Sequence, residues 1–178
     1  MKLSIPHRRQ VNDYMCGPAT LQMVLAFLGE QKSQRKIRKL MKASPRELQT
    51  KGLDNHKMIR AVQRSGFFAY VNEYSNLEEL KAFVKQGHPV VVNYVEPSNE
   101  DGHFAVVKGF NMILGTVILS DPWNGADFAL PEKQFINRWH AKWWKGEGNY
   151  KGHWLMVVSK DPIKVGRIYK PYKYTENK

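Results

Sequence analysis

The sequence predicts an α+β fold in two lobes, with a helical N-terminal lobe, a C-terminal antiparallel sheet, and a cleft between them. Three observations predict this class. Apolar residues recur at helical spacing through the first part of the chain. Short apolar segments separated by turn residues fill the second part. Helices and strands are therefore segregated along the chain, which is typical of α+β domains.

Three helices are expected in the N-terminal lobe. The first spans residues 18–28, because its leucines and valine share one face, Pro18 suits a first turn and Gly29 suits a stop. The second spans residues 33–43, with apolar residues inward and basic residues outward, and ends at Ser44-Pro45. The third spans residues 54–65, is capped by Asp54 and ends at a glycine.

The remaining elements alternate between strands and helices. A strand is expected at residues 67–73, followed by a helix through residue 86 that opens with the capping box Asn76 to Glu79. The segment 89–95 is almost continuously apolar, which predicts a central strand. Segments 103–110 and 116–120 are expected to form a hairpin, and a short helix (131–140) and a last strand (153–159) complete the prediction.

Length and composition restrict the class of protein. The 178 residues are 42% hydrophobic, enough for one domain with a real core. No secretory signal opens the chain, and the longest apolar run in a helical context is far too short to span a bilayer. A single cysteine excludes an internal disulfide. We therefore expect a soluble cytoplasmic protein as the simplest interpretation, with a domain excised from a larger protein, such as a transporter, as the open alternative.

The chain carries a formal net charge of +12, and its basic residues gather in two places. One is the predicted second helix and the other is a Lys/Tyr-rich tail, residues 161–178, which we separate from a domain at residues 1–160. Such charge favours weak contact with nucleic acid or an anionic membrane. The alternative is a solvated helix face and a basic tail without a partner.

Cys16 lies where a loop turns into the first helix. A thiol at a helix start is close to the positive end of the helix dipole, which favours the thiolate. Gln10, six residues upstream, is placed to supply an amide donor to the same point. Nucleophile and oxyanion donor would then lie on one short segment. The alternatives are a buried structural cysteine and a surface glutamine.

A cysteine nucleophile also needs a base and a group that orients the base. His103 opens one strand of the predicted hairpin and Asp121 ends the other, at similar distances from the turn. Cross-strand pairing is therefore expected to bring the two side chains together. The alternatives are a strand-edge histidine and an ordinary Asp-Pro turn. The remaining histidines have no metal-site spacing, so we predict no metal and no cofactor.

These segments together resemble a known family. Gln10 and Cys16-Gly-Pro-Ala, then Gly-His103-Phe-Ala-Val-Val-Lys-Gly, then Ser-Asp121-Pro-Trp, are similar to the bacteriocin-processing peptidases. Members of this family are papain-like cysteine peptidases that cleave leader peptides after a double glycine, often as the first domain of an export transporter. The resemblance covers roughly residues 5–140 and implies a papain-like fold, a peptide or protein substrate, Cys16 as nucleophile, His103 as base and acid, Asp121 as orienting group, and Gln10 with the Cys16 N–H as oxyanion donors.

The sequence departs from the family pattern in two respects. No transporter follows, so the chain is more similar to standalone relatives than to export domains. The basic tail and a Trp-rich segment that includes Trp143 and Trp144 are extra. Stacking on bases is one role for these tryptophans, and packing or a partner surface is the alternative that we favour. Besides hydrolysis, two functions stay open: an acyltransferase or ligase that uses the same acyl-enzyme, and a non-catalytic module that binds peptide or nucleic acid.

Overall fold

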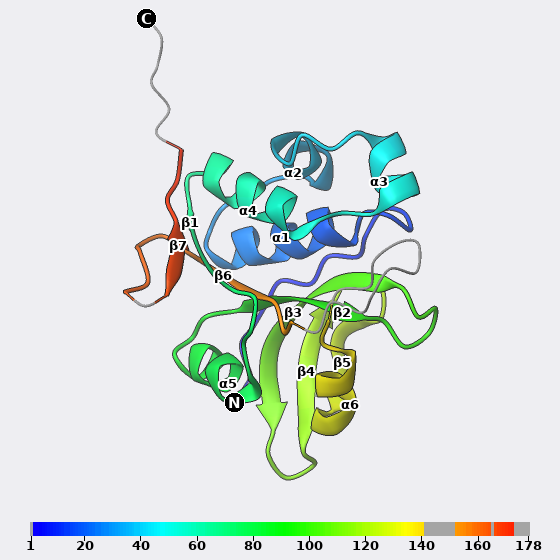
Figure 1. Cartoon of the computed structure of the whole chain (residues 1–178), viewed down its shortest axis with the longest axis vertical. Helices are drawn as coiled ribbons and strands as arrows, with labels where there is room; N and C mark the ends of the chain where they lie inside the picture. The colour runs from blue at the N-terminus through cyan, green and yellow to red at the C-terminus, as the bar shows by residue number, and fades with distance from the viewer. Residues whose placement is uncertain (1, 141–151, 165, 173–178) are drawn as a thin grey trace, which may run out of the picture.

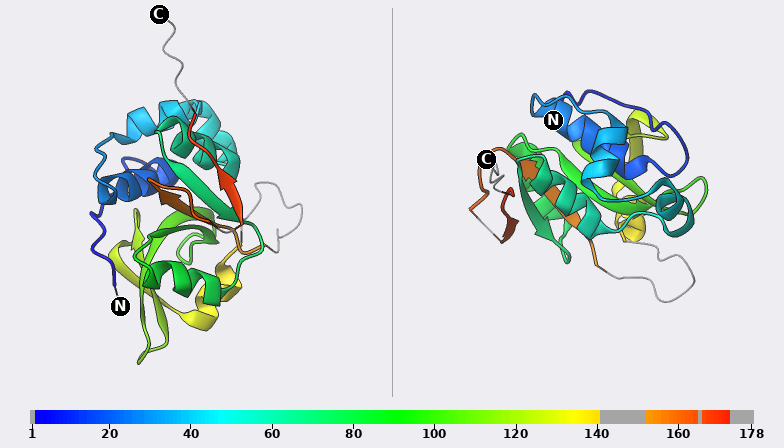
Figure 2. Two further views of the ribbon diagram at one scale, coloured as in Figure 1. Left: turned by 90° about the vertical axis from the view of Figure 1, so that its left-hand side faces the viewer. Right: turned by 90° about the horizontal axis from the view of Figure 1, so that it is seen from above.

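The computed structural model describes residues 2–140, 152–164 and 166–172. Trp143 and Trp144 therefore lie outside the described residues. The helices are α1 (Cys16–Phe27), α2 (Gln34–Leu40), α3 (Pro45–Lys51), α4 (Asn55–Arg64), α5 (Leu77–Lys85) and α6 (Glu132–Arg138). Helices α1 to α4 gather at one end of the molecule, and α5 and α6 lie beside the sheet at the other end (Figures 1 and 2). The predicted α+β class is confirmed.

The sheet has seven strands, in the order β5-β4-β3-β2-β6-β1-β7, and every neighbouring pair is antiparallel. The strands are β1 (Phe68–Asn72), β2 (Val90–Val95), β3 (Gly102–Asn111), β4 (Thr116–Asp121), β5 (Gly125–Pro131), β6 (Leu155–Ser159) and β7 (Arg167–Tyr169). The nearly all-apolar β2 occupies the middle of this order, as predicted. The hairpin between β3 and β4 is also confirmed, and its turn is held by the Asn111 side chain, which accepts from the N–H groups of Ile113 and Leu114.

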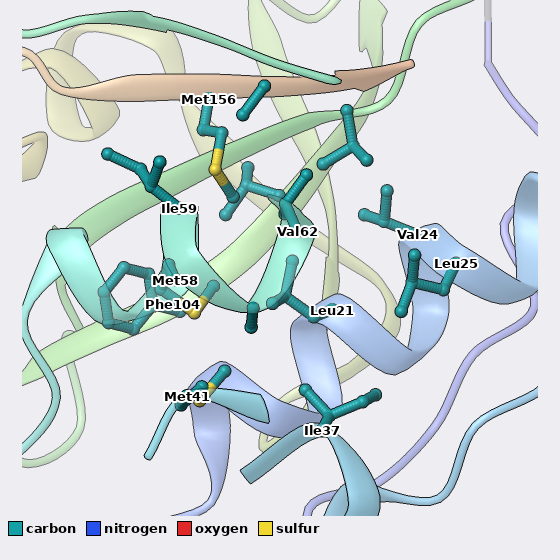
Figure 3. Close-up of a cluster of buried hydrophobic side chains, with 14 of the residues drawn as sticks. Leu21, Val24, Leu25, Ile37, Met41, Met58, Ile59, Val62, Phe104 and Met156 are labelled. Carbon is teal, nitrogen blue, oxygen red and sulfur yellow. The ribbon is translucent and has the colours of Figure 1, made fainter. Parts of the chain in front are cut away.

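Both faces of the sheet are covered, which explains why the central strands are apolar at almost every position. Alternate residues belong to two separate clusters. Val91, Phe104 and Met156 pack with α1 and α4 on one face, as Figure 3 shows for part of this cluster. Their neighbours along the strands pack with α5 and α6 on the other face. Elements that lie far apart in sequence are thereby fixed against one rigid sheet.

Four helix starts have side-chain caps, of which the sequence analysis predicted those at Asp54 and Asn76. Ser33, Ser44, Asp54 and Asn76 each accept a hydrogen bond from the backbone N–H three residues later. The predicted second helix ends earlier than expected, at Leu40 rather than residue 43. Lys42 just beyond it has a φ of 53°, in the left-handed region, so the helix cannot continue.

Three elements were missed. Ser44-Pro45 was predicted only to end a helix, but the same pair caps and begins α3, because proline suits a first helical turn. Strand β5 at the sheet edge is half-exposed and lacks a clear alternating pattern. Strand β7 lies within residues 161–178 and pairs with β1. This part of the predicted tail is therefore a strand of the sheet.

Candidate active site

Cys16 is the first residue of α1 and is half-buried. Unlike α2 to α5, this helix has no side-chain cap, because its N-cap is Met15. The N–H groups of the first turn therefore remain open to a charge at Cys16. The helix packs on β3 beside the site, where the Thr20 hydroxyl donates to the Phe104 carbonyl at 2.9 Å. The start of the helix is thus fixed against the strand that carries His103.

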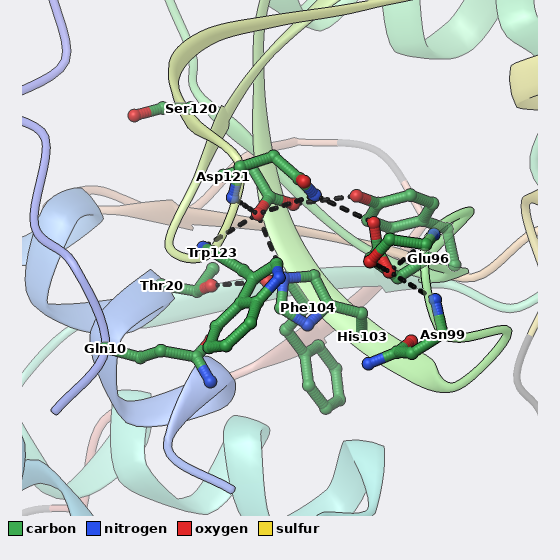
Figure 4. A network of polar contacts seen from close by, with 12 residues as sticks. Gln10, Thr20, Glu96, Asn99, His103, Phe104, Ser120, Asp121 and Trp123 are labelled. Atoms are coloured by element: carbon green, nitrogen blue, oxygen red, sulfur yellow. Dashed lines mark hydrogen bonds and ion pairs between the residues drawn. The ribbon is translucent and has the colours of Figure 1, made fainter. Parts of the chain in front are cut away.

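His103 and Asp121 meet as the hairpin predicts. His103 Nε2 lies 3.1 Å from Asp121 Oδ1, and Figure 4 shows the two side chains turned toward each other. Asp121 is fully buried and His103 almost so. Because Val106 lies opposite Ser120, continuing the register places Asp121 diagonal to His103 on the same face of the sheet. A carboxylate can only accept, so Nε2 carries the proton and Nδ1 is left for the thiol.

Tyr94 is a site residue that the sequence reasoning missed. It lies opposite His103 in the β2–β3 register, and the two rings contact edge to face with centroids 5.8 Å apart. Its hydroxyl donates to Asp121 Oδ2 at 2.7 Å. The signal was available, because pairing the two predicted strands across the loop at residues 96–101 places Tyr94 opposite His103. Asp121 is thus held on one oxygen by His103 and on the other by Tyr94.

The turn after β4 completes the binding of the Asp121 carboxylate. Oδ1 also accepts from the backbone N–H groups of Trp123 and Asn124, both at 2.8 Å. The Asn124 side chain donates to Glu96 Oε1 at 3.0 Å. Glu96 is buried, and its other oxygen accepts from Ser98 and Asn99 within the loop before β3. The loop before β3 is therefore held in place by hydrogen bonds to the buried Glu96 carboxylate.

Charge and hydrogen bonding at the site favour an ionised pair. Burial raises the pKa of the Cys16 thiol, but the hydrogen bond and charge of His103, with the N–H groups of Phe104 and Gly17, outweigh it and hold the pKa below its usual value. Burial lowers the pKa of His103, but Asp121 and Cys16 together raise it to about 10. Burial likewise raises the pKa of Asp121, and its donors, His103 first, lower it below the usual value. The favoured state is thiolate with imidazolium.

Gln10 is fixed close to this group, although its side chain bonds within its own loop. Its backbone N–H donates to the carbonyl of Pro122, the residue after Asp121, at 3.1 Å. Its side-chain Nε2 donates to the Asn12 carbonyl at 2.8 Å, which occupies one of two amide hydrogens. The side chain is buried, and Oε1 has no hydrogen-bond partner among the described residues. Among the described residues, the second amide hydrogen of Nε2 also has no hydrogen-bond partner.

Gln34, on α2, is a second residue that the sequence reasoning missed. It is buried, accepts from the N–H of Val11 at 3.1 Å, and donates to the carbonyl of Arg9 at 2.8 Å. It thereby holds the backbone on both sides of Gln10. No local sequence signal identifies it, because the contact joins residues more than twenty positions apart.

The described part of the chain contains no cluster of three or more His, Cys, Asp or Glu side chains placed to hold a metal ion. Within that same part, no helix combines the length and the apolar character needed to cross a bilayer.

Solved structures of several peptidase domains share this fold. The peptidase domain of Streptococcus ComA, a bi-functional ABC transporter involved in quorum sensing, matches with a TM-score of 0.66 at 18% identity, covering 89% of this chain and all of that one (100%). A double glycine motif protease from an AMS/PCAT transporter, solved with its leader peptide, matches at 0.64 and 22%, covering 88% and 92%. A C39-like peptidase from Bacillus anthracis matches at 0.66 and 18%, covering 90% and 98%. The fold is that of papain-like cysteine peptidase domains.

Sequence comparison supplies the family. The model of the Peptidase_C39 like family matches residues 2–142, which is well over half of the chain. The chain belongs to the Peptidase_C39 like family and is a cysteine peptidase, a hydrolase. A search of curated protein sequences finds no match.

Proposed function

We propose that the chain hydrolyses a peptide bond through Cys16, His103 and Asp121, with Gln10 and the Cys16 backbone N–H as oxyanion donors. The observation that carries the proposal is the continuous chain of contacts from the fully buried Asp121, through His103, to the Cys16 thiol at an uncapped helix start. Asp121, His103 and Cys16 come from three different elements. A purely structural role would not require a carboxylate, an imidazole and a thiol to follow one another in this order.

The proposed reaction follows from these contacts. The thiolate of Cys16 attacks the carbonyl carbon, and the C–S bond forms as the carbonyl electrons move to oxygen. Gln10 and the Cys16 N–H donate to that oxyanion. The protonated His103 gives its Nδ1 proton to the leaving amine, and the C–N bond breaks. Neutral His103 then takes a proton from water, the hydroxide displaces the thiolate, and the carboxylic acid product leaves. Asp121 holds the imidazole in one tautomer throughout.

A peptide is the proposed substrate class because the similar double glycine motif protease was solved with a leader peptide. The test is cleavage of a peptide library that includes Gly-Gly sequences, followed by mass spectrometry. The wild type should cleave a defined subset, and Cys16→Ala should cleave none while keeping the same circular dichroism spectrum. Equal cleavage by Cys16→Ala would reject the proposed nucleophile.

The same assay separates hydrolysis from acyl transfer, the alternative that shares the acyl-enzyme. Adding a free amine in excess should leave the products unchanged if water is the acceptor. An amide product that appears only with the amine would instead identify a transferase.

A further inference from the structure

A cavity of about 450 Å³ lies beside the loop that joins Gln10 to Cys16. Asn12, Tyr14 and Met15 of this loop form one wall. Met15 directly precedes Cys16, and neighbouring Cα atoms are about 3.8 Å apart. An extended peptide advances about 3.3 Å per residue. A substrate side chain within a few residues of the bond attacked by Cys16 is therefore within reach of this cavity.

The part of the cavity lining that comes from α2 is cationic. It includes Arg35 and Arg38, which are one helical turn apart and so share a face. Within the described part of the chain, Arg35 forms no ion pair, and Arg38 donates one N–H to the Ala43 carbonyl. None of the described residues that line the cavity is acidic. Glu47, farther along the chain, already pairs with Lys57. Positive charge in the cavity is therefore left without a counter-charge from its own walls.

The loop and the α2 part of the lining are fixed to each other by Gln34, which also lines the cavity. Its side chain accepts from Val11 N–H in the loop and donates to Gln22 Oε1 on α1 at 3.1 Å. Because Gln34 is buried and bonded on both sides, the cavity keeps its shape without a ligand. A preformed site loses little free energy to reorganisation when it binds.

We propose that this cavity is a substrate subsite for an acidic side chain, Asp or Glu, close to the scissile bond. The inference rests on the proposed peptidase function and names its substrate class as acidic peptides. A guanidinium donates two parallel N–H groups to a carboxylate. A substrate amide carries no charge and a substrate lysine has no acceptor, so neither can form this charged pair with arginine. The same loop forms a cavity wall and carries Gln10, so an occupied subsite also steadies the proposed oxyanion donor.

The experiment is a positional library in which each residue near the cleaved bond is fixed in turn as Glu, Gln or Lys. At one position, the wild type should prefer Glu over Gln by about two- to fivefold in kcat/KM, because Arg35 is exposed and an exposed ion pair contributes up to about 1 kcal/mol. Arg35→Glu should remove this preference or turn it toward Lys, and Arg35→Lys should keep part of it. Lys85→Glu is the matched control, because this exposed residue of α5 changes the net charge equally and should leave the preference intact.

Folding of each variant is checked by the rate of Cys16 alkylation with iodoacetamide, which Arg35→Glu should not change. Equal kcat/KM for Glu and Gln at every position overturns the subsite and leaves the peptidase proposal standing. No cleavage by the wild type rejects the peptidase proposal instead. In that case, the subsite is tested by fluorescence anisotropy of labelled Glu-rich and Gln-rich peptides bound to the Cys16→Ala variant. Selective binding of the Glu-rich peptide that is lost in the double variant Cys16→Ala, Arg35→Glu supports the subsite. Any other pattern overturns it.

Nucleic acid is the competing occupant of the basic face of α2. A short DNA duplex that binds the wild type and Arg35→Glu equally, and displaces the Glu-rich peptide from both, would overturn the acidic subsite.

Discussion

Replacing Tyr94 by Phe removes one hydroxyl from the buried Asp121 site and leaves the ring in place. The hydroxyl lies 2.7 Å from Asp121 Oδ2, and both residues are 0% exposed. Among the described residues, Oδ2 accepts no other hydrogen bond, because the remaining donors reach Oδ1. The variant therefore leaves a buried carboxylate oxygen without a partner, while the edge-to-face contact with His103 is retained.

The cost follows from the charge on the acceptor. A hydrogen bond to a charged group contributes about 1.5–3 kcal/mol, so the free energy of unfolding should fall by about 2 kcal/mol. In a chain of this length, each kcal/mol shifts Tm by about 2–4 °C, so Tm should drop by about 4–8 °C at neutral pH. The measurement is thermal unfolding followed by circular dichroism.

The pH dependence of the Tm difference between the wild type and Tyr94→Phe tests the assigned hydrogen bond. The pKa of Asp121 is lowered in the folded state, so its stabilisation is present above its ordinary pKa and is lost as pH falls through the folded value. The Tyr94 hydroxyl contributes to that lowering. The Tm difference between the wild type and Tyr94→Phe should therefore be largest at neutral pH and should narrow in acid. A difference that is absent, or constant across this range, would refute the assigned hydrogen bond.

The rate of Cys16 alkylation distinguishes a positioning role of the Tyr94 hydroxyl from an effect on the ionisation of His103 and Cys16. Tyr94→Phe keeps the Asp121 charge, so His103 stays protonated and iodoacetamide should alkylate Cys16 at nearly the wild-type rate at neutral pH. Asp121→Asn removes the charge, which lowers the pKa of His103 and raises that of Cys16, so alkylation should slow markedly. Equal slowing in both variants would mean that the hydroxyl acts on His103 itself.

Three further predictions concern the rest of the site. The thiolate–imidazolium pair exists between the lowered pKa of Cys16 and the raised pKa of His103, so kcat/KM should rise at a pH below 9.0 and fall near about pH 10; a single rising limb would contradict the pair. Gln10→Ala should lower kcat by about 10²–10³ with the alkylation rate unchanged, and unchanged kcat would exclude it as oxyanion donor. A Cβ on Gly17 would lie 2.1 Å from Leu53 Cδ2, so Gly17→Ala should cost about 1–3 kcal/mol in urea unfolding, whereas an unaltered midpoint would show that Leu53 moves aside freely.

Local sequence signals predicted most of the elements because their causes are local. The caps at Asp54 and Asn76 act within one helical turn, and the hairpin turn at Asn111 is closed by its own side chain. The meeting of His103 and Asp121 was predictable for a related reason, since a short hairpin fixes which residues of its two strands lie close together.

Contacts between distant segments were beyond the reach of the sequence. Strand β7 forms by pairing with β1, nearly a hundred residues earlier in the chain, so its own three residues hold no sufficient signal. Nothing in the sequence around Gln34 marks it as a site residue. Its role comes from its hydrogen bonds to the backbone on both sides of Gln10, which only the tertiary structure brings close. The cationic cavity likewise exists only where α2 packs beside that loop.

The sequence by itself determined that the chain has a cysteine at a helix start, a histidine and an aspartate on paired strands, and an α+β arrangement, because each depends on short-range periodicity, capping or turn geometry. Only the tertiary structure decided how the charges at the site are balanced. The Tyr94 hydroxyl, the buried Glu96 loop and the helix start of Cys16 converge from separate elements, and burial against both faces of the sheet sets the low-dielectric surroundings in which those contacts shift the pKa values of Cys16, His103 and Asp121.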